Sequence, residues 1–247
     1  MEVHSKDLIQ RTLIVDGIWE PKNTEIFQKI INPGWTIYDV GANVGYFTLL
    51  FAKCAGPRGR IIAFEPAKNN FEALTRNIEL NPSLSDTIKT EPIALSNKTG
   101  RVLLVLDDKG NVGSTRCLER RPETSDESDG HWAQSLPADE YRRDIRGGRI
   151  DLIKIDVEGH ELKVLEGMLG TLGSAFPPIL AIEVRKDTLA GAGVSPEGLY
   201  NFTSSTGYTP VTWNRQKGRF TYESSFVEAE LVFFLNNRNP AHRNLLA

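Results

Sequence analysis

The sequence predicts an α/β fold: a mostly parallel sheet with an antiparallel end and helices on both faces. Short apolar runs alternate with segments of helical period, the pattern of strands joined by helical crossovers. Several of these runs end in an acidic residue, as strands do at the ligand-binding edge of an open sheet. Near the C-terminus, two strand-like segments lack a helix between them, which indicates an antiparallel pair.

The expected elements follow from these patterns in chain order. A helix is expected at 24–31, and strands are expected near 36–40, 60–65, 88–95, 101–107, 151–157 and 178–184. Further helices are expected near 44–54, 68–80, 161–169 and 196–205, and the terminal strand pair at 209–214 and 227–235. In the segment 68–80, Phe71, Leu74 and Ile78 share one helical face, and Asn81-Pro82 ends the helix.

We expect one domain over residues 1–247, because 40% hydrophobic and 25% charged residues suit a single substantial core. Residues 1–35 are interpreted either as a cap across a ligand site or as ordinary packing of Ile26, Phe27 and Ile30 on the sheet. Residues 108–149 are polar and charge-mixed, which predicts a solvated loop, with a substrate lid as the alternative.

Composition argues against several classes of protein. A net charge of −3 gives no global reason to bind nucleic acid or an anionic membrane. The chain lacks an apolar run of about 18 residues and an apolar signal-peptide core, so we expect a soluble cytoplasmic protein. Cys54 and Cys117 have no metal-ligand spacing and are expected to be free, buried thiols.

The segment from Asp39 to Thr48 predicts a nucleotide-like ligand, because an apolar strand leads into a glycine-rich turn that opens a helix. A dinucleotide-binding turn would need glycines where Asn43 and Tyr46 stand. The acid at Asp39 would repel a pyrophosphate and attract a cationic amine. The turn therefore favours S-adenosylmethionine over NAD.

Glu65 ends the next apolar run and is predicted to accept hydrogen bonds from the ribose hydroxyls of that ligand. A surface acid at a strand end is the alternative interpretation. Charge-assisted hydrogen bonds of this kind contribute about 1.5–3 kcal/mol each. Glu65 is thus the second expected contact of the nucleoside.

The segment 151–161 brings further titratable groups to the same edge of the sheet. Asp156, Glu158 and His160 follow an apolar strand, and Glu183 ends the next one. His160 is the first candidate for a general base, with orientation of the turn as its alternative role, and Glu183 or Glu158 follow as bases. Glu183 with Asp156 could also bind Mg²⁺ or Ca²⁺, an option that two acids alone do not favour. Glu161 is interpreted as a favourable acid in a first helical turn.

Five motifs, taken in chain order, resemble the FkbM-type methyltransferase family. They are Asp39 to Gly45, Phe64-Glu65-Pro66, Ala94-Leu95-Ser96, Asn111 to Ser114, and Lys154 to Glu161. The resemblance implies a class I methyltransferase sheet of seven strands, S-adenosylmethionine as donor, and O-methylation of a hydroxyl on a sugar, polyketide or other natural product. The polar insert after Ser114 and the sequence Leu136-Pro-Ala-Asp139, where relatives tend to have Thr-Leu-Asp, depart from the family pattern.

The motifs and the resemblance together define the predicted site. The expected cofactor-binding residues are Asp39, Gly41, Ala42, Asn43, Gly45, Tyr46, Phe47, Glu65, Pro66, Ala94 and Asp156. The expected catalytic residues are His160, Asp156, Glu158 and Glu183. The expected partner is a small-molecule hydroxyl acceptor, without nucleic acid or membrane. An NAD-dependent oxidoreductase, a non-catalytic nucleoside-binding module and, more weakly, a nucleic-acid methyltransferase are the alternatives.

Overall fold

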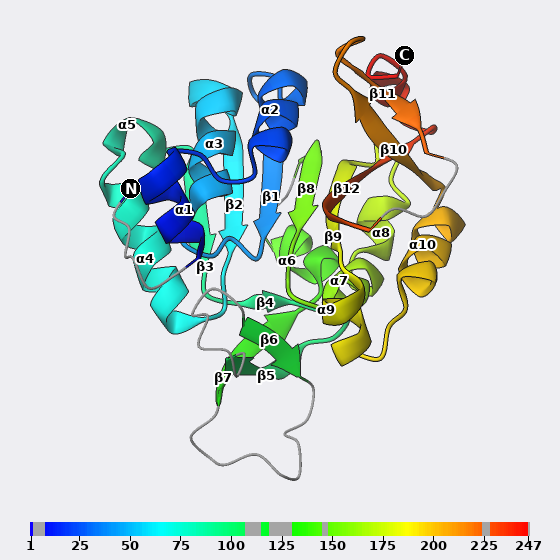
Figure 1. The fold of residues 1–247 in the computed structure, drawn as a ribbon. Helices are drawn as coiled ribbons and strands as arrows, with labels where there is room; N and C mark the ends of the chain where they lie inside the picture. The colour runs from blue at the N-terminus through cyan, green and yellow to red at the C-terminus, as the bar shows by residue number, and fades with distance from the viewer. Residues whose placement is uncertain (2–7, 107–114, 119–129, 145–147, 224–227, 247) are drawn as a thin grey trace.

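The strands of the computed structural model form two sheets (Figure 1). The structure describes residues 1, 8–106, 115–118, 130–144, 148–223 and 228–246, with backbone only for 8–10, 106, 115–118, 130, 143 and 144. Within these ranges, one sheet has eight strands and the other four. The larger sheet carries the core, and the smaller one lies at its carboxyl end.

The larger sheet is parallel in its first part and antiparallel in its last. Its parallel strands, in spatial order, are β3 (Ile88–Glu91), β2 (Arg60–Phe64), β1 (Thr36–Val40), β8 (Leu152–Ile155) and β9 (Ile179–Val184). The antiparallel strands continue the sheet from β9 as β12 (Ala229–Asn236), β10 (Tyr208–Asn214) and β11 (Arg219–Tyr222). The predicted α/β fold with an antiparallel end is therefore confirmed.

Two details of the strand prediction need correction. The described part of the sheet has eight strands and not seven, because β11 adds an edge strand between β10 and β12 in the chain. The single strand expected at 88–95 is two strands, β3 and β4 (Ala94–Leu95), which belong to different sheets. Pro92 separates them, because proline has no backbone N–H to continue a ladder.

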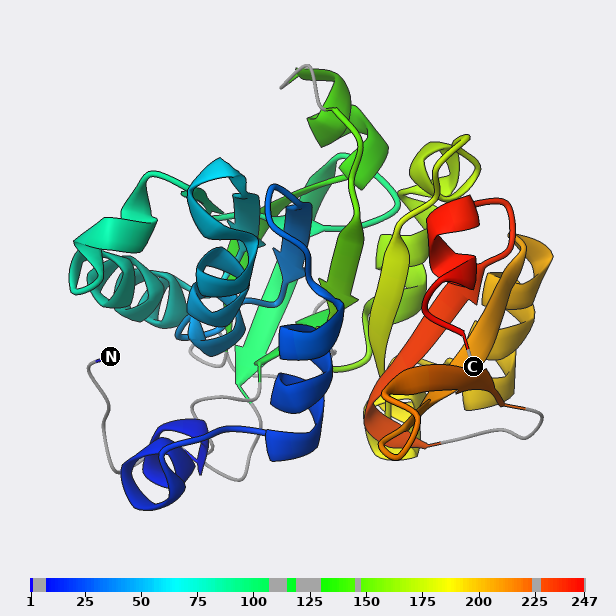
Figure 2. The ribbon, with the colours of Figure 1, turned by 90° about the horizontal axis from the view of Figure 1, so that it is seen from above.

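Helices cover both faces of the larger sheet, as Figure 2 shows for α2 and α6 on opposite sides of the strands. One face packs under α2 (Pro21–Ile30), α3 (Tyr46–Ala55) and α4 (Lys68–Glu79), with η1 (Gly56–Arg58) and α5 (Pro82–Ser85) in the connections. The other face packs under α6 (Ala138–Asp144), α7 (Glu161–Glu166), α8 (Leu169–Leu172), α9 (Lys186–Gly191) and α10 (Pro196–Ser205). The remaining helices are α1 (Leu8–Asp16) and α11 (Pro240–Arg243).

Successive residues of the central strands alternate between the two apolar layers. Ile37 and Ile61 pack with Phe27 of α2 and Phe51 of α3, whereas Tyr38 and its neighbours pack on the opposite layer. This alternation explains why successive residues of these strands are mostly apolar, since a parallel sheet covered on both faces has no solvent side. In the described part of the chain, no helix combines the length and apolarity needed to cross a membrane.

The smaller sheet replaces much of the loop expected at 108–149. It has the order β4, β7 (Gly130–Leu136), β5 (Gly100–Leu106) and β6 (Thr115–Leu118). Helix α6 follows and buries Ala138 and Tyr141 in the main core. The prediction of a solvated loop is therefore wrong for these described parts, because backbone pairing with β5 and packing of α6 order them. The motif Asn111 to Ser114 and the side chain of Cys117 lie outside what the structure describes.

Candidate functional site

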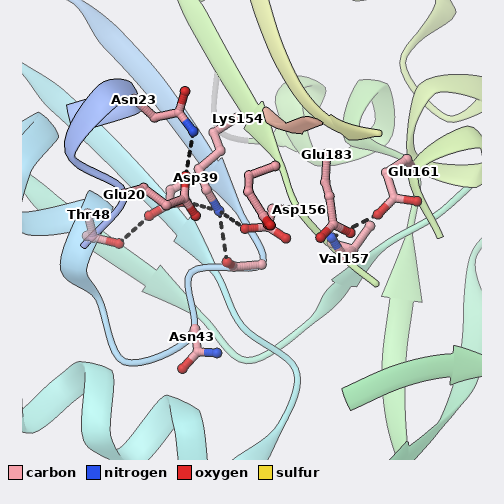
Figure 3. Close-up of polar contacts among 12 residues, drawn as sticks. Glu20, Asn23, Asp39, Asn43, Thr48, Lys154, Asp156, Val157, Glu161 and Glu183 are labelled. Carbon is pink, nitrogen blue, oxygen red and sulfur yellow. Dashed lines mark hydrogen bonds and ion pairs between the residues drawn. The ribbon is translucent and has the colours of Figure 1, made fainter. Parts of the chain in front are cut away.

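A cavity opens at the carboxyl ends of β1, β2, β8 and β9, where the sequence predicted a ligand site. Its wall is formed by the ends of these strands and the loops after them, with contributions from the N-terminal segment, β5 and β12. It is lined by Trp19, Glu20, Gly41, Ala42, Asn43, Val44, Tyr46, Phe47, Glu65, Pro66, Asn70, Leu104, Lys154, Asp156, Val157, Glu158, Glu183, Arg185 and Glu230. Part of this polar lining is drawn in Figure 3.

The turn between β1 and α3 is shaped by close backbone approach. Gly41 has φ +78°, and a Cβ atom there would lie 1.9 Å from the carbonyl oxygen of Asp156. Gly45, expected to let the helix approach a ligand, instead faces α4: a Cβ there would lie 2.6 Å from a methyl group of Leu74. The two glycines therefore pack the turn against its neighbours, and Gly41 forms part of the cavity wall.

Glu65 lies in the cavity wall as predicted and is 5% exposed. Its Oε2 accepts a hydrogen bond from the backbone N–H of Asn43 at 2.8 Å, and its Oε1 accepts one from Ala67 at 2.9 Å. Burial raises the pKa of Glu65 to about 7, although the hydrogen bonds from Ala67 and Asn43 act in the opposite direction. The carboxylate is thus fixed in orientation, and each oxygen retains a lone pair for a ligand hydroxyl.

A buried lysine joins two of the predicted acids. The ammonium of Lys154 lies 3.1 Å from Oδ2 of Asp156 and 3.6 Å from Oδ1 of Asp39, and it donates to the carbonyl of Gly41 at 3.3 Å (Figure 3). Burial alone would lower the pKa of Lys154, but Asp156 and Asp39 outweigh it and the net pKa is raised. Lys154 is therefore a charged, ion-paired residue of the cavity wall.

This network changes the role of Asp39. Asp39 is fully buried and does not line the cavity. Its Oδ2 accepts a hydrogen bond from the hydroxyl of Thr48 at 2.6 Å, and its other oxygen faces Lys154. Burial raises the pKa of Asp39, whereas Lys154 and Thr48 lower it. Asp39 is therefore not placed for the predicted direct contact with a ligand amine, because its carboxylate faces Lys154 beneath the cavity wall.

The acids after β8 and β9 share one wall of the cavity. Asp156, Glu158 and Glu183 all line it, as predicted for catalytic candidates. Glu183 is 3% exposed, and burial, followed by the charges of Asp156, Glu161 and Glu158, raises its pKa well above the ordinary value. Among the described residues, no group of three or more His, Cys, Asp or Glu side chains has the geometry to hold a metal ion.

His160, the first choice for a base, lies elsewhere. It is buried, does not line the cavity, and its Nε2 lies 3.0 Å from the hydroxyl of Ser96, next to β4. His160 is therefore not placed as a base facing the cavity would be, and its position agrees with the alternative, a residue that orients the turn before α7. Glu161 also acts locally, because its Oε1 accepts hydrogen bonds from the backbone N–H groups of Val157 and Gly159 at 3.1 Å each.

Most of the expected cofactor contacts are in the cavity wall. Those that line it are Gly41, Ala42, Asn43, Tyr46, Phe47, Glu65, Pro66 and Asp156. Besides Asp39 and Gly45, the exception is Ala94, which packs with Ala67 and Leu104 in a small apolar cluster between the two sheets. The sequence motifs therefore predicted where the cavity lies, although Asp39, Gly45 and Ala94 do not line it.

A family comparison decides what kind of protein carries this cavity. The family model "Methyltransferase FkbM domain" matches residues 39–210, a range that includes the glycine-rich turn, Glu65 and the acids after β8 and β9. The chain belongs to the FkbM methyltransferase domain family. The predicted resemblance is thereby confirmed.

Individual relatives are similar to this chain over part of their length. Methyltransferase sdnD of Sordaria araneosa is 35% identical over 156 residues, which are 53% of this chain and 60% of that protein. Hexuronic acid methyltransferase AglP of Haloferax volcanii is 26% identical over 168 residues, covering 68% of this chain and 61% of that protein. The chain thus spans about 60% of the length of these relatives.

Among solved structures, methyltransferase FkbM from Methylobacillus flagellatus KT superposes with a TM-score of 0.52 at 15% identity. The superposition covers 86% of this chain and 50% of that protein. At this level of identity the likeness shows a shared fold.

The cavity of this FkbM family member also has lining residues that were not among the expected site residues. They are Trp19, Glu20, Val44, Asn70, Leu104, Lys154, Val157, Arg185 and Glu230. One of these residues, Lys154, could have been predicted from the sequence. It pairs in register with Asp39 on the neighbouring parallel strand, so their side chains lie on the same face of the sheet. A lysine in the middle of a strand buried on both faces needs such a counter-charge.

The backbone of the cavity is also unusual. In the described part of the chain, the residues other than glycine with positive φ are Glu20 at 43°, Asn43 at 50° and Glu158 at 54°. All three line the cavity, although they come from three separate segments. Left-handed backbone costs an ordinary residue about 1–2 kcal/mol, so it persists where surrounding structure and function fix it.

Proposed function

We propose that this protein is an S-adenosylmethionine-dependent methyltransferase that methylates a hydroxyl of a small molecule. Membership of the FkbM methyltransferase domain family supports methyl transfer, and the cavity supports the choice of donor. The observation that carries the proposal is the buried carboxylate of Glu65, held by two backbone N–H groups at the end of β2. Such a carboxylate suits the paired hydroxyls of a ribose.

The charge of the cavity also favours this donor over a dinucleotide. Six carboxylate side chains line it against two basic ones, and Lys154 is occupied by Asp39 and Asp156. This lining attracts a ligand that carries a sulfonium and an ammonium, and repels the phosphates of NAD. The charge of the cavity therefore agrees with the sequence of the turn, which has Asn43 and Tyr46 where a dinucleotide-binding turn would have glycines.

Different side chains of the cavity would bind the donor, position Asp156 and accept the proton of the acceptor. When bound, S-adenosylmethionine supplies an already activated methyl group, so positioning provides most of the rate acceleration. Glu65 would bind the ribose, and Lys154 keeps the carboxylate of Asp156 in place beside the cavity. Glu183 or Glu158 would hold the proton that the acceptor hydroxyl releases. A cation in the cavity favours the ionised form of Glu183, which burial and neighbouring acids oppose in the free protein.

The donor assignment is tested by calorimetry with S-adenosylhomocysteine. Glu65→Ala should weaken its binding about tenfold or more, the value of one charge-assisted hydrogen bond. Glu72→Ala, which removes an exposed carboxylate on α4, serves as the matched control and should bind like the wild type. Unchanged affinity in Glu65→Ala, or a larger thermal stabilisation by NAD than by S-adenosylhomocysteine, would rule out the proposed donor site.

We propose a sugar or another polyhydroxylated natural product as the acceptor class, which is supported by the similarity to AglP, a hexuronic acid methyltransferase. Formation of S-adenosylhomocysteine is measured with a panel of hydroxylated acceptors, and Glu183→Gln and Glu158→Gln are compared with the wild type. Loss of the base should lower kcat about 10²–10⁴-fold. Turnover with amine acceptors alone would contradict O-methylation.

A further inference from the structure

Glu20 belongs to the cavity wall although it precedes the family-matched region. It stands immediately before Pro21 with φ 43° and ψ 67°, in the left-handed region. This conformation is unfavourable for a residue with a Cβ atom, and proline disfavours helical conformations in the residue before it. Something other than local preference therefore keeps the side chain of Glu20 at the cavity.

The segment around Glu20 is fastened to the glycine-rich turn. The hydroxyl of Thr24 donates to the carbonyl of Trp19 at 2.8 Å and lies 3.0 Å from the hydroxyl of Tyr46, at the start of α3. The amide of Asn23, itself 8% exposed, donates to Oε2 of Glu20 at 2.6 Å (Figure 3). These contacts fix both the backbone and the carboxylate of Glu20 before any ligand arrives.

The surroundings of Glu20 leave its charge available to a ligand. Its hydrogen-bond partner Asn23 is neutral, whereas Lys154 is ion-paired with Asp39 and Asp156. Burial, and then the charge of Asp156, raises the pKa of Glu20 to about 7. A carboxylate that is half-buried and repelled by a neighbouring acid gains most from a cationic partner.

We propose that Glu20 binds the positively charged α-ammonium of the methyl donor's amino-acid part. This inference rests on the proposed function, because it assigns a residue to the donor named there. It also moves the predicted amine contact from Asp39, which is sealed beneath the cavity, to a carboxylate that lines it. The N-terminal segment then serves as a cap that recognises the donor as well as packing on the sheet.

The test compares two ligands that share the nucleoside but differ in the amino-acid part. S-adenosylhomocysteine carries the ammonium, and 5′-methylthioadenosine lacks it. At pH 8, calorimetry should show that Glu20→Gln weakens S-adenosylhomocysteine about tenfold or more and changes 5′-methylthioadenosine less than about twofold. Glu25→Gln is the matched control, since Glu25 lies on α2 in an exposed ion pair with Arg215 and both affinities should stay at the wild-type values.

Three outcomes overturn this assignment. Wild-type affinity of Glu20→Gln for S-adenosylhomocysteine contradicts the ammonium contact. Equal weakening of both ligands shows that Glu20 only shapes the cavity. If the wild-type protein binds neither ligand, the proposed function itself fails, which is a distinct result because it appears before any substitution is made.

A second variant separates binding from folding. Glu20→Gly removes the carboxylate and fits the left-handed backbone, so its melting temperature should equal or exceed that of the wild type. Its affinity for S-adenosylhomocysteine should nevertheless fall as in Glu20→Gln. A Glu20→Gly protein that binds S-adenosylhomocysteine normally would refute the inference even if Glu20→Gln were unstable.

Discussion

At the scale of single residues, Lys154 shows how a buried charge organises the site. It is 2% exposed and lies between Asp39, which is fully buried, and Asp156 at the cavity. Removing one member of such a group leaves the others buried without compensation. The ammonium is thus needed for the fold as well as for the position of Asp156.

Lys154→Met should therefore destabilise the protein by about 3–5 kcal/mol, because it leaves two facing carboxylates without their cation. Urea unfolding at pH 7 measures the loss. The double variant Lys154→Met with Asp39→Asn should lose less than the sum of the single variants, since the remaining carboxylate no longer faces another charge. Strictly additive losses would show that the two residues are energetically independent.

The sequence identified the residues next to the glycine-rich turn because one motif contains both the turn and several residues of the cavity wall. The sequence did not predict which way a side chain points when that direction depends on tertiary packing. Asp39 and His160 both occur in strong motifs, yet one faces Lys154 and the other faces Ser96. Glu20 was missed because its place in the cavity depends on how the N-terminal segment folds back over α3.

At the scale of elements, the turn after β1 and the loop after β8 meet at Gly41. Gly41→Ala should disturb both, because the added Cβ would overlap the carbonyl oxygen of Asp156. Gly56 offers a matched control: it has φ +65°, and a Cβ there would meet nothing within 4 Å. Gly56→Ala should cost about 1–3 kcal/mol from backbone strain alone, because φ +65° with ψ −172° is a conformation used almost only by glycine, and Gly41→Ala should cost about 1–3 kcal/mol more.

Chemical denaturation of the two variants, combined with calorimetry of S-adenosylhomocysteine binding, checks this expectation. Gly41→Ala should also lose affinity, whereas Gly56→Ala should retain it. Equal destabilisation of the two variants would mean that the loop after β8 moves aside without cost.

The parallel strands were predictable because burial on both faces makes each a continuous apolar run. The smaller sheet was harder to predict, since burial along β7 does not follow the size of the apolar side chains. The large Trp132 is 47% exposed, whereas the neighbouring small Ala133 is 7% exposed. Only β5 carried a clear apolar signal. Its antiparallel partners are ordered by backbone pairing, which no local pattern of side chains reveals.

At the scale of the whole molecule, buried acids should make stability depend on pH. Burial raises the pKa values of Glu20, Glu65 and Glu161 to about 7, and that of Glu183 further. Each group binds more protons in the folded than in the unfolded state, so its stabilising effect is complete below its unfolded pKa and is lost as pH rises through the folded value. Burial lowers the pKa of His242 to about 4, so the effect of this residue has the opposite sign. Its contribution to stability rises with pH between about 4 and 6.5 and is constant above that range.

The melting temperature of the ligand-free protein should therefore fall between about pH 6.5 and pH 8.5. Glu183→Gln keeps the shape of the side chain but cannot ionise, so it should melt above the wild type at pH 6.5 and by a larger margin at pH 8.5. Differential scanning calorimetry across this window provides the measurement. Parallel curves for the two proteins would show that Glu183 does not titrate there.

The interior position of β12 has a consequence for biosynthesis. It pairs with β9 on one side and β10 on the other, although it follows both in the chain. During translation, β9 and β10 each keep an unpaired edge until residue 236 has left the ribosome, and Glu230 on β12 completes the cavity wall at the same moment. The nascent chain thus passes through a stage with exposed, aggregation-prone strand edges, and its cavity is complete only after synthesis of the sheet has ended.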